Sequence, residues 1–226
     1  MSSLPDHSFR LILFDLDGTL VDSQMSICSI MGEAFEKVGL EPPDLATTRR
    51  GVGLHLDKAI ARLLPEDAED NLVAKLVSLY REAYWARREH SEFNEPLFDG
   101  VLDILETLNR PEVCLGIATG RNRRSLNAIL EGHGLEEMFV VIKTPEDGPS
   151  KPSPAIIHQA MSDIGTTQEE TVFIGDTTYD MQAGRNAGVR AIAAGWGYHE
   201  ADELAAAGAA RVLDDIREVP GALRDL

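Results

Sequence analysis

Two aspartates follow an apolar run near the start of the chain. The run is Leu11–Phe14, and Asp15 and Asp17 come directly behind it in the stretch LILFDLDGTLVDS. Its branched and aromatic side chains predict a strand buried on both faces, and open α/β folds build their sites at the carboxyl ends of such strands. Asp15 could attack a phosphorus atom and form an aspartyl-phosphate. Asp17 suits general acid and base chemistry, protonating a leaving alkoxide and then activating water.

Three later groups of polar residues also come just behind apolar runs or before predicted helices. Thr119 and Gly120 supply a hydroxyl and a bare backbone at a helix start, a common way to hold an anion. Lys151 lies between prolines in the stretch SKPSP, which stiffen its loop. Asp176 ends the run TVFIGD, and Asp180 follows one helical turn later. If the strands run parallel, all of these residues meet at one edge of a sheet.

This set of residues supports one coherent chemistry. Carboxylates that converge would repel one another unless a cation lay among them, and oxygen ligands select a hard ion. We therefore expect Mg²⁺ to be held by Asp15 and Asp176, with Asp180 supporting it from behind.

The phosphoryl oxygens need positive partners of their own. Lys151, Thr119 and the backbone amides near Gly18 and Gly120 would surround them and stabilise the charge that spreads in the transition state. Each piece also has an ordinary structural explanation. The stretch DLDGT could be an Asp/Gly turn, Thr119-Gly120 an N-cap, and Lys151 a solvated loop residue.

The elements that must position these residues alternate between strand and helix, as in a parallel sheet covered by helices. We predict strands at 11–14, 113–118, 139–142, 171–174 and 189–193, and helices at 101–108, 123–132, 154–162 and 180–187. After the last of these strands we predict a shorter helix and a further strand before the C-terminal tail.

A helical segment interrupts this alternation between residues 24 and 91. A helix begins after Ser23 and ends at Gly39, where glycine favours termination. We predict a loop at 41–48, which contains two prolines, then a short helix over 54–64. A long amphipathic helix follows from Pro65, with acids in its first turns and arginines toward its end.

The four polar groups together resemble the motifs of the haloacid dehalogenase-like (HAD) superfamily. The stretch Leu11 to Ser23 is similar to that family's first motif, hhhhDxDGTLxDS, and Thr-Gly, Lys-Pro and Gly-Asp-x-x-x-Asp follow in the family's order. The resemblance covers residues 11 to about 215. The helical segment is similar in placement to the C1 cap of the phosphoglycolate phosphatase-like branch.

The resemblance implies a fold and a division of the chain. The fold is α/β: a Rossmann-like parallel sheet with helices on both faces, formed by residues 1–22 and 92–226, plus an all-helical C1 cap formed by residues 23–91. It also implies that the backbone carbonyl of Asp17 joins Asp15 and Asp176 as a ligand of Mg²⁺.

Arginines in two places bear on the substrate. Arg50 and Gly51 belong to the one basic, flexible spot of the cap, RRGVG. In capped relatives this loop faces the substrate, which implies that Arg50 could meet a second anionic group; a solvated arginine is the alternative. Arg121 begins a cationic cluster at a helix start, where cations oppose the helix dipole. We expect nearby acids to neutralise it rather than phosphate to bind it.

Composition narrows the partners. The 226 residues carry 38 acids against 21 bases, for a net charge of −17, which argues against nucleic acid and anionic membranes as partners. Cys28 and Cys114 are too few for a disulfide framework and suit a reducing cytoplasm. The N-terminus resembles no export signal, and no apolar run approaches the ~20 residues of a membrane span. The oligomeric state cannot be read from the sequence.

We therefore predict a Mg²⁺-dependent phosphatase acting on a small phosphorylated metabolite, most similar to phosphoglycolate phosphatase. A sugar phosphomutase like β-phosphoglucomutase shares the core and cap type. A phosphonate hydrolase would need a cap lysine for a Schiff base, and Lys37, Lys58 and Lys75 lie in no recognisable setting. A non-catalytic binding protein is possible on any such fold. A dehalogenase is disfavoured because Asp17 and Gly18, which are parts of the phosphatase pattern in the first motif, are both present.

Overall fold

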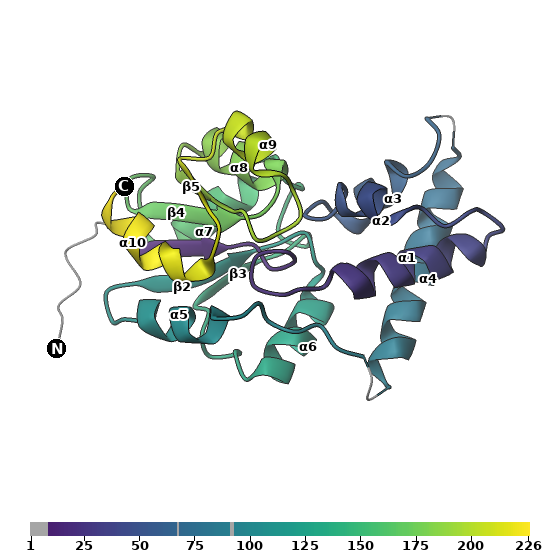
Figure 1. The fold of residues 1–226 in the computed structure, drawn as a ribbon, viewed down its shortest axis with the longest axis horizontal. Helices are drawn as coiled ribbons and strands as arrows, with labels where there is room; N and C mark the ends of the chain where they lie inside the picture. Colours follow the sequence, from purple (N-terminus) through teal and green to yellow (C-terminus); the bar gives the residue numbers. More distant parts are fainter. Residues whose placement is uncertain (1–8, 67, 91–92) are drawn as a thin grey trace.

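A six-stranded parallel sheet forms the centre of the larger part of the molecule (Figure 1). The computed structural model describes residues 9–66, 68–90 and 93–226. The strands lie in the order β3-β2-β1-β4-β5-β6, so the first strand of the chain is central. Their bounds are β1 Leu11–Phe14, β2 Cys114–Ala118, β3 Val141–Lys143, β4 Thr171–Gly175, β5 Arg190–Ala194 and β6 Arg211–Leu213.

Strand β1 is buried on both faces because alternate side chains enter two separate apolar layers. Ile12 and Phe14 pack into the layer that helices α5, α6 and α10 cover. Leu11 and Leu13 pack into the layer under α7 and α8. Figure 1 shows α5 and α6 on one side of the sheet and α8 and α9 on the other. These helices are α5 Val101–Leu108, α6 Arg123–His133, α7 Ala155–Ile164, α8 Thr178–Ala187, α9 Ala201–Ala207 and α10 Val219–Arg224, the last preceded by the short 3₁₀ helix η1 Ile216–Glu218.

Four helices form a second body at one end of the sheet (Figure 1). They are α1 Gln24–Glu36, α2 Leu45–Arg49, α3 Leu56–Ala61 and α4 Asp70–Arg88. Their own apolar core includes Met31, Phe35, Ile60 and Leu76. The division of the chain into core and cap remains a prediction. Its second boundary, at residues 91–92, lies outside the described residues.

The two segments that join these bodies pair with each other. Val21 bridges antiparallel to Leu97, and the amide of Asp22 donates to the carbonyl of Pro96 at 2.8 Å. The cap therefore leaves and rejoins the sheet at neighbouring points.

Several element bounds differ from those expected. Residues 41–48 were expected to form a loop, but helix α2 begins within them because the Asp44 side chain accepts a hydrogen bond from the amide of Thr47 at 2.7 Å. Helix α4 begins at Asp70, five residues after Pro65. Strand β3 starts at Val141, since Val140 points outward and is 68% exposed. Among the described residues, no helix has both the length and the apolar character needed to cross a membrane.

Candidate active site

Three buried aspartates lie together at the carboxyl edge of the sheet. Asp15 follows β1 and Asp176 follows β4, which are paired neighbours, and Asp180 lies in the first turn of α8. One oxygen from each lies within 4.8 Å of the others. All three residues are fully buried. The parallel register brings Phe14 beside Ile174, so the chain delivers the first two carboxylates to the same edge.

Lys151 enters this cluster from the loop before α7. Its Nζ lies 2.9 Å from Asp15 Oδ2 and 2.6 Å from Asp180 Oδ1, and its side chain is fully buried. When all three carboxylates are ionised, one ammonium leaves an excess of negative charge in a buried site.

Two of the aspartates have their oxygens fixed by neighbouring donors. Asp176 accepts from the Thr19 hydroxyl at 3.1 Å and from the amide of Tyr198 at 2.9 Å. Asp180 accepts from both the amide and the hydroxyl of Thr177, which closes a capping box on α8. Asp15 differs, because its Oδ1 has no hydrogen-bond partner among the described residues.

Burial and mutual repulsion shift the proton affinities of these groups. Burial raises the pKa of Asp15 to about 7, although the Lys151 charge opposes the shift. Burial, together with the charges of Asp180 and Asp15, raises the pKa of Asp176 well above its ordinary value. Burial alone would lower the Lys151 pKa, but Asp15 and Asp180 raise it. Without a further cation, burial and mutual repulsion therefore favour the protonated forms of Asp15 and Asp176.

The donor set fits a hard divalent cation. It consists only of carboxylate oxygens, one of them buried without a partner, in a site with excess negative charge, and Mg²⁺ prefers such ligands. The backbone is also shaped closely around Asp176. Gly18 has φ +82°, and a Cβ there would lie 2.1 Å from Asp176 Oδ2. A Cβ at Gly197 would lie 2.2 Å from the Cβ of Asp176, so neither position has room for a side chain.

Asp17 lies apart from the three clustered aspartates and is 7% exposed. The Ser23 hydroxyl donates to its Oδ1 at 2.6 Å, and Arg121 holds both of its oxygens, with Nε 3.0 Å from Oδ2. A fork of this kind fixes the plane of a carboxylate. The Asp17 carboxylate is therefore oriented by Arg121, which lies in the loop after β2.

Arg121 also binds Glu95, in the segment that returns from the cap. Its Nη2 lies 3.0 Å from Glu95 Oε1, and Glu95 accepts from the hydroxyls of Tyr84 at 3.0 Å and Ser26 at 2.9 Å. Acids thus neutralise Arg121, as expected from the sequence. Glu95 itself was missed, because an isolated glutamate in a return segment carries no motif.

Thr119 and Gly120 lie where the cap meets the core. Thr119 is buried, and its hydroxyl accepts from the amide of Arg121 at 3.2 Å. A Cβ at Gly120 would lie 2.5 Å from the carbonyl oxygen of Leu54 and 2.7 Å from that of Gly53. The cap backbone therefore rests directly on Gly120.

The two arginines before this cap loop point in different directions. Arg50 is 62% exposed and pairs with Glu203 of α9 at 3.1 Å, outside the cavity described below. The structure therefore gives no support to the expectation that Arg50 faces the substrate. Arg49 instead donates to the carbonyl of Tyr198 at 3.0 Å. Gly51 does line the cavity.

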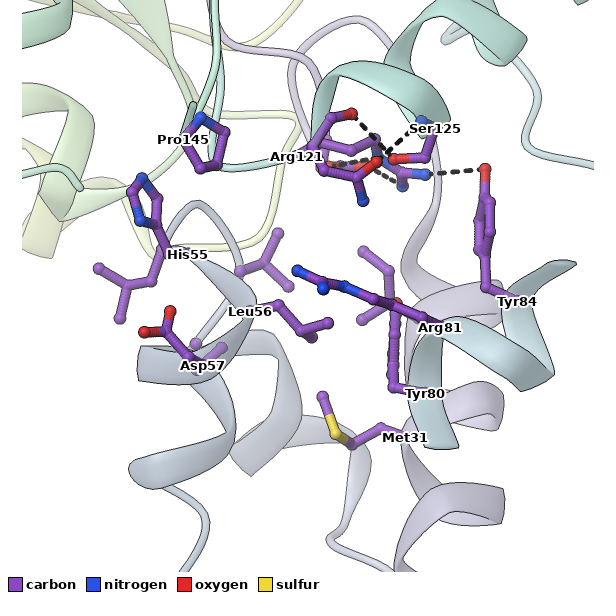
Figure 2. A pocket seen from close by; sticks show the side chains of 18 of the residues that line it. Met31, His55, Leu56, Asp57, Tyr80, Arg81, Tyr84, Arg121, Ser125 and Pro145 are labelled. Carbon is purple, nitrogen blue, oxygen red and sulfur yellow. Dashed lines mark hydrogen bonds and ion pairs between the residues drawn. The ribbon is translucent and has the colours of Figure 1, made fainter. Parts of the chain in front are cut away.

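A cavity of about 350 Å³ lies between core and cap (Figure 2). Asp17, Gly120 and Arg121 form its core side. Asp15 and the rest of the acidic cluster are not on its wall. The space therefore opens beside the acid of Asp17 and extends into the cap.

Comparison with known proteins identifies the family. The model of the family described as "Haloacid dehalogenase-like hydrolase" matches residues 12–194. The chain belongs to the haloacid dehalogenase-like hydrolases. It is 34% identical to "Probable phosphatase IndB" of Dickeya dadantii, over 96% of this chain and 94% of that protein. The sequence-based prediction of this family is confirmed, and with it that of a phosphatase.

The names of other relatives of this hydrolase describe different activities. The chain is 29% identical to "Phosphoglycolate phosphatase" of Pseudomonas putida, over 94% of this chain and 79% of that protein. It is 32% identical to "Tyrosine-protein kinase PtkA" of Mycobacterium tuberculosis, over 97% and 75%. A solved HAD-like hydrolase, SP0104 of Streptococcus pneumoniae, superimposes with a TM-score of 0.82 at 28% identity, over 95% and 98% of the two chains. The predicted fold class is therefore also confirmed.

Proposed function

We propose that this phosphatase hydrolyses the phosphomonoester of a small metabolite through an aspartyl-phosphate on Asp15. The observation that carries the proposal is the unpartnered Oδ1 of Asp15, buried beside Lys151. A carboxylate oxygen free of hydrogen bonds is available for attack. The names of IndB and of the Pseudomonas phosphoglycolate phosphatase support the reaction type.

The first step transfers the phosphoryl group to the protein. An Asp15 oxygen forms a bond to phosphorus while the bond from phosphorus to the alcohol oxygen breaks. Asp17 gives a proton to the departing alkoxide. Because Arg121 holds both oxygens of Asp17 in this structure, one of those contacts must open for the proton to be carried there.

The second step returns the site to its starting state. Asp17 takes a proton from water, whose oxygen attacks phosphorus as the bond to Asp15 breaks, and inorganic phosphate leaves. Lys151 and the backbone near Gly18 and Thr119 face the charge that spreads over the phosphoryl oxygens.

Mg²⁺ would be held by Asp15 and Asp176, with the Asp17 carbonyl as a further ligand and Asp180 orienting the site from behind. When bound, it offsets the negative charge of the carboxylates and of the phosphoryl group. The donor set supports this choice of ion.

A phosphonate hydrolase is not supported. Within the described part of the cap, none of Lys37, Lys58 and Lys75 lines the cavity, and Lys37 instead pairs with Glu33 at 2.9 Å. No amine is therefore placed to form a Schiff base with a substrate held there.

Phosphate release tests the proposal. The purified protein is offered a panel of phosphometabolites, sugar phosphates included, with Mg²⁺ and then with EDTA, and both inorganic phosphate and isomerised sugar phosphate are measured. Release that depends on Mg²⁺ supports the proposal. Isomerisation without release would show a mutase, and release unaffected by EDTA would remove the metal from the mechanism.

A further inference from the structure

The cavity beside Asp17 is lined mainly by apolar and aromatic side chains of the cap. Helix α4 contributes the rings of Tyr80, Tyr84 and Trp85, and Met31, Leu56 and Leu63 add aliphatic surface. Residues 80 and 84 share one face of the helix, because residues four apart lie above one another, and residue 85 is the next residue along the chain. Figure 2 shows Tyr80, Tyr84 and Met31 around the open space.

The size of this space does not match glycolate. At about 350 Å³ the cavity has room for roughly twelve water molecules, taking about 30 Å³ for each. Glycolate is a two-carbon acid with almost no apolar surface. Held here it would leave most of the apolar wall uncovered, whereas cavities of this volume ordinarily hold ligands that cover their walls.

The polar residues on the cap side of the cavity include Thr48, His55 and Asp57, but Arg81 is the one arginine or lysine among the described cap residues of the wall. Arg81 projects into the space in Figure 2 and forms no ion pair or hydrogen bond with any other described residue. The Tyr80 hydroxyl has no protein partner within the described ranges, but it lies toward Asp17, because its pKa, which burial raises, is also affected by the charges of Arg121, Glu95 and Asp17. Arg81 is therefore the cap cation that faces an occupant of the cavity. By contrast, the guanidinium of Arg121 is already engaged by Asp17 and Glu95.

We propose that the cavity selects a phosphomonoester whose alcohol part is an apolar ring carrying an anionic group within reach of Arg81. This inference rests on the proposed function, because it places the leaving oxygen at Asp17. The ring packs between the aromatic residues of α4 and the aliphatic residues opposite, and Arg81 meets the anionic group. Binding an anion there gives Arg81 the partner that the protein does not supply.

Two matched pairs of variants separate the effect of the cavity's shape from the effect of the Arg81 charge. Ala59 lines the cavity from α3, whereas Ala61 of the same helix is exposed and off the wall. Phenylalanine at position 59 fills the space, and the same residue at 61 controls for the added bulk. Arg81→Leu removes the cation, and Lys75→Leu, exposed on the same helix and off the wall, controls for the lost charge.

The substrates are phosphoglycolate, benzyl phosphate and 4-carboxybenzyl phosphate. We expect kcat/KM to rise in that order. Ala59→Phe should lower the ratio of benzyl phosphate to phosphoglycolate by about tenfold or more, the scale of steric discrimination in a pocket, while Ala61→Phe leaves the ratio unchanged. Arg81→Leu should lower the ratio of 4-carboxybenzyl to benzyl phosphate about tenfold, and Lys75→Leu should not. Phosphoglycolate as the best substrate, or equal losses on all three, would overturn the inference.

Binding is measured separately from turnover, so that a failure of the cavity assignment can be distinguished from a failure of the proposed function. The probes are benzylphosphonate and phosphonoacetate, titrated by calorimetry into the Mg²⁺-loaded protein. Tighter binding of benzylphosphonate, lost in Ala59→Phe but kept in Ala61→Phe, supports the cavity assignment even if no ester is hydrolysed, a result that would overturn only the proposed function. Equal binding of the two probes would overturn the cavity assignment whatever the turnover.

Discussion

The acidic cluster and the cap cavity differ in almost every physical property. The cluster is fully buried and charged, and its groups are fixed by hydrogen bonds from neighbouring strands and loops. The cavity wall is mainly apolar and comes largely from cap segments that carry no motif, with Asp17, Gly120 and Arg121 on its core side. The first region suits a reaction common to a whole family. The second suits the choice of one substrate, because its walls can change without disturbing the charges.

The largest expected effect comes from breaking the cluster at its nucleophile. Asp15→Asn removes the attacking oxygen, and we expect phosphate release to fall by at least ~10³-fold on every substrate. Circular dichroism should show an unchanged fold. A variant that retains near-normal turnover would exclude Asp15 as the nucleophile.

Asp17 lies at the boundary between the two regions, and its loss should be almost as costly. Asp17→Asn removes the proton donor, so kcat should fall by about 10² to 10⁴. KM should change much less, because the alcohol part of the substrate is held by the cap. A rise in KM with unchanged kcat would instead make Asp17 a binding residue.

Glu95 connects the regions, and its removal tests that connection. Glu95→Ala leaves Arg121 with a buried charge that has lost one partner, which should lower the free energy of unfolding by about 3–5 kcal/mol. Chemical denaturation measures this. Glu82→Ala, on the exposed side of α4, should change it by less than about 0.5 kcal/mol. Equal effects of the two variants would show that the buried pair stabilises the protein no more than an exposed glutamate does.

The raised pKa of Asp15 gives the cluster a pH signature when no divalent cation is bound. Burial shifts this pKa from 3.8 to about 7, so the ionised residue opposes folding. Its contribution is neutral below pH 4, becomes unfavourable as the pH rises to 7, and is constant above. In EDTA, the melting temperature of Asp15→Asn minus that of the wild type should therefore increase between pH 4 and 7.

Two controls accompany that measurement. Asp202→Asn, on the exposed side of α9, should show no such trend. Added Mg²⁺ should reverse the difference above pH 7, because a cation binds the ionised carboxylate and stabilises the wild type. A difference that stays flat with pH in EDTA would mean that Asp15 is ionised at no cost in the folded protein.

The smallest effect is expected at Arg50. Its pair with Glu203 is largely exposed, and such pairs contribute about 0–1 kcal/mol. Arg50→Ala should therefore change kcat/KM less than twofold on every substrate. A larger loss on anionic substrates alone would return Arg50 to the site that the resemblance suggested.

The positions of site residues could be predicted from the sequence where a local pattern and the parallel topology of the sheet act together. The run Leu11–Phe14 predicts a buried central strand, and parallel strands must carry Asp15 and Asp176 to one edge. Lys151 was expected beside them, and its loop does bring it there. No such rule links Arg121 with Glu95, which lie 26 residues apart and meet only when the cap returns to the core.

Cap features were harder to predict for the same reason. Arg49 and Arg50 are equivalent in the sequence, and only the start of α2 at Leu45 decides which of them faces the core. Tyr80 and Arg81 belong to an ordinary amphipathic helix. Their position on a cavity wall depends on how far α4 stands from α3, which no local pattern encodes.

The bridge between Val21 and Leu97 has a consequence for engineering and for evolution. Because the cap leaves and re-enters through two paired segments, the whole insertion can be exchanged at those two points without cutting a strand of the sheet. Insertions with adjacent ends are tolerated well. A chimera that carries a relative's cap between these positions would keep this protein's chemistry and take on the relative's choice of substrate.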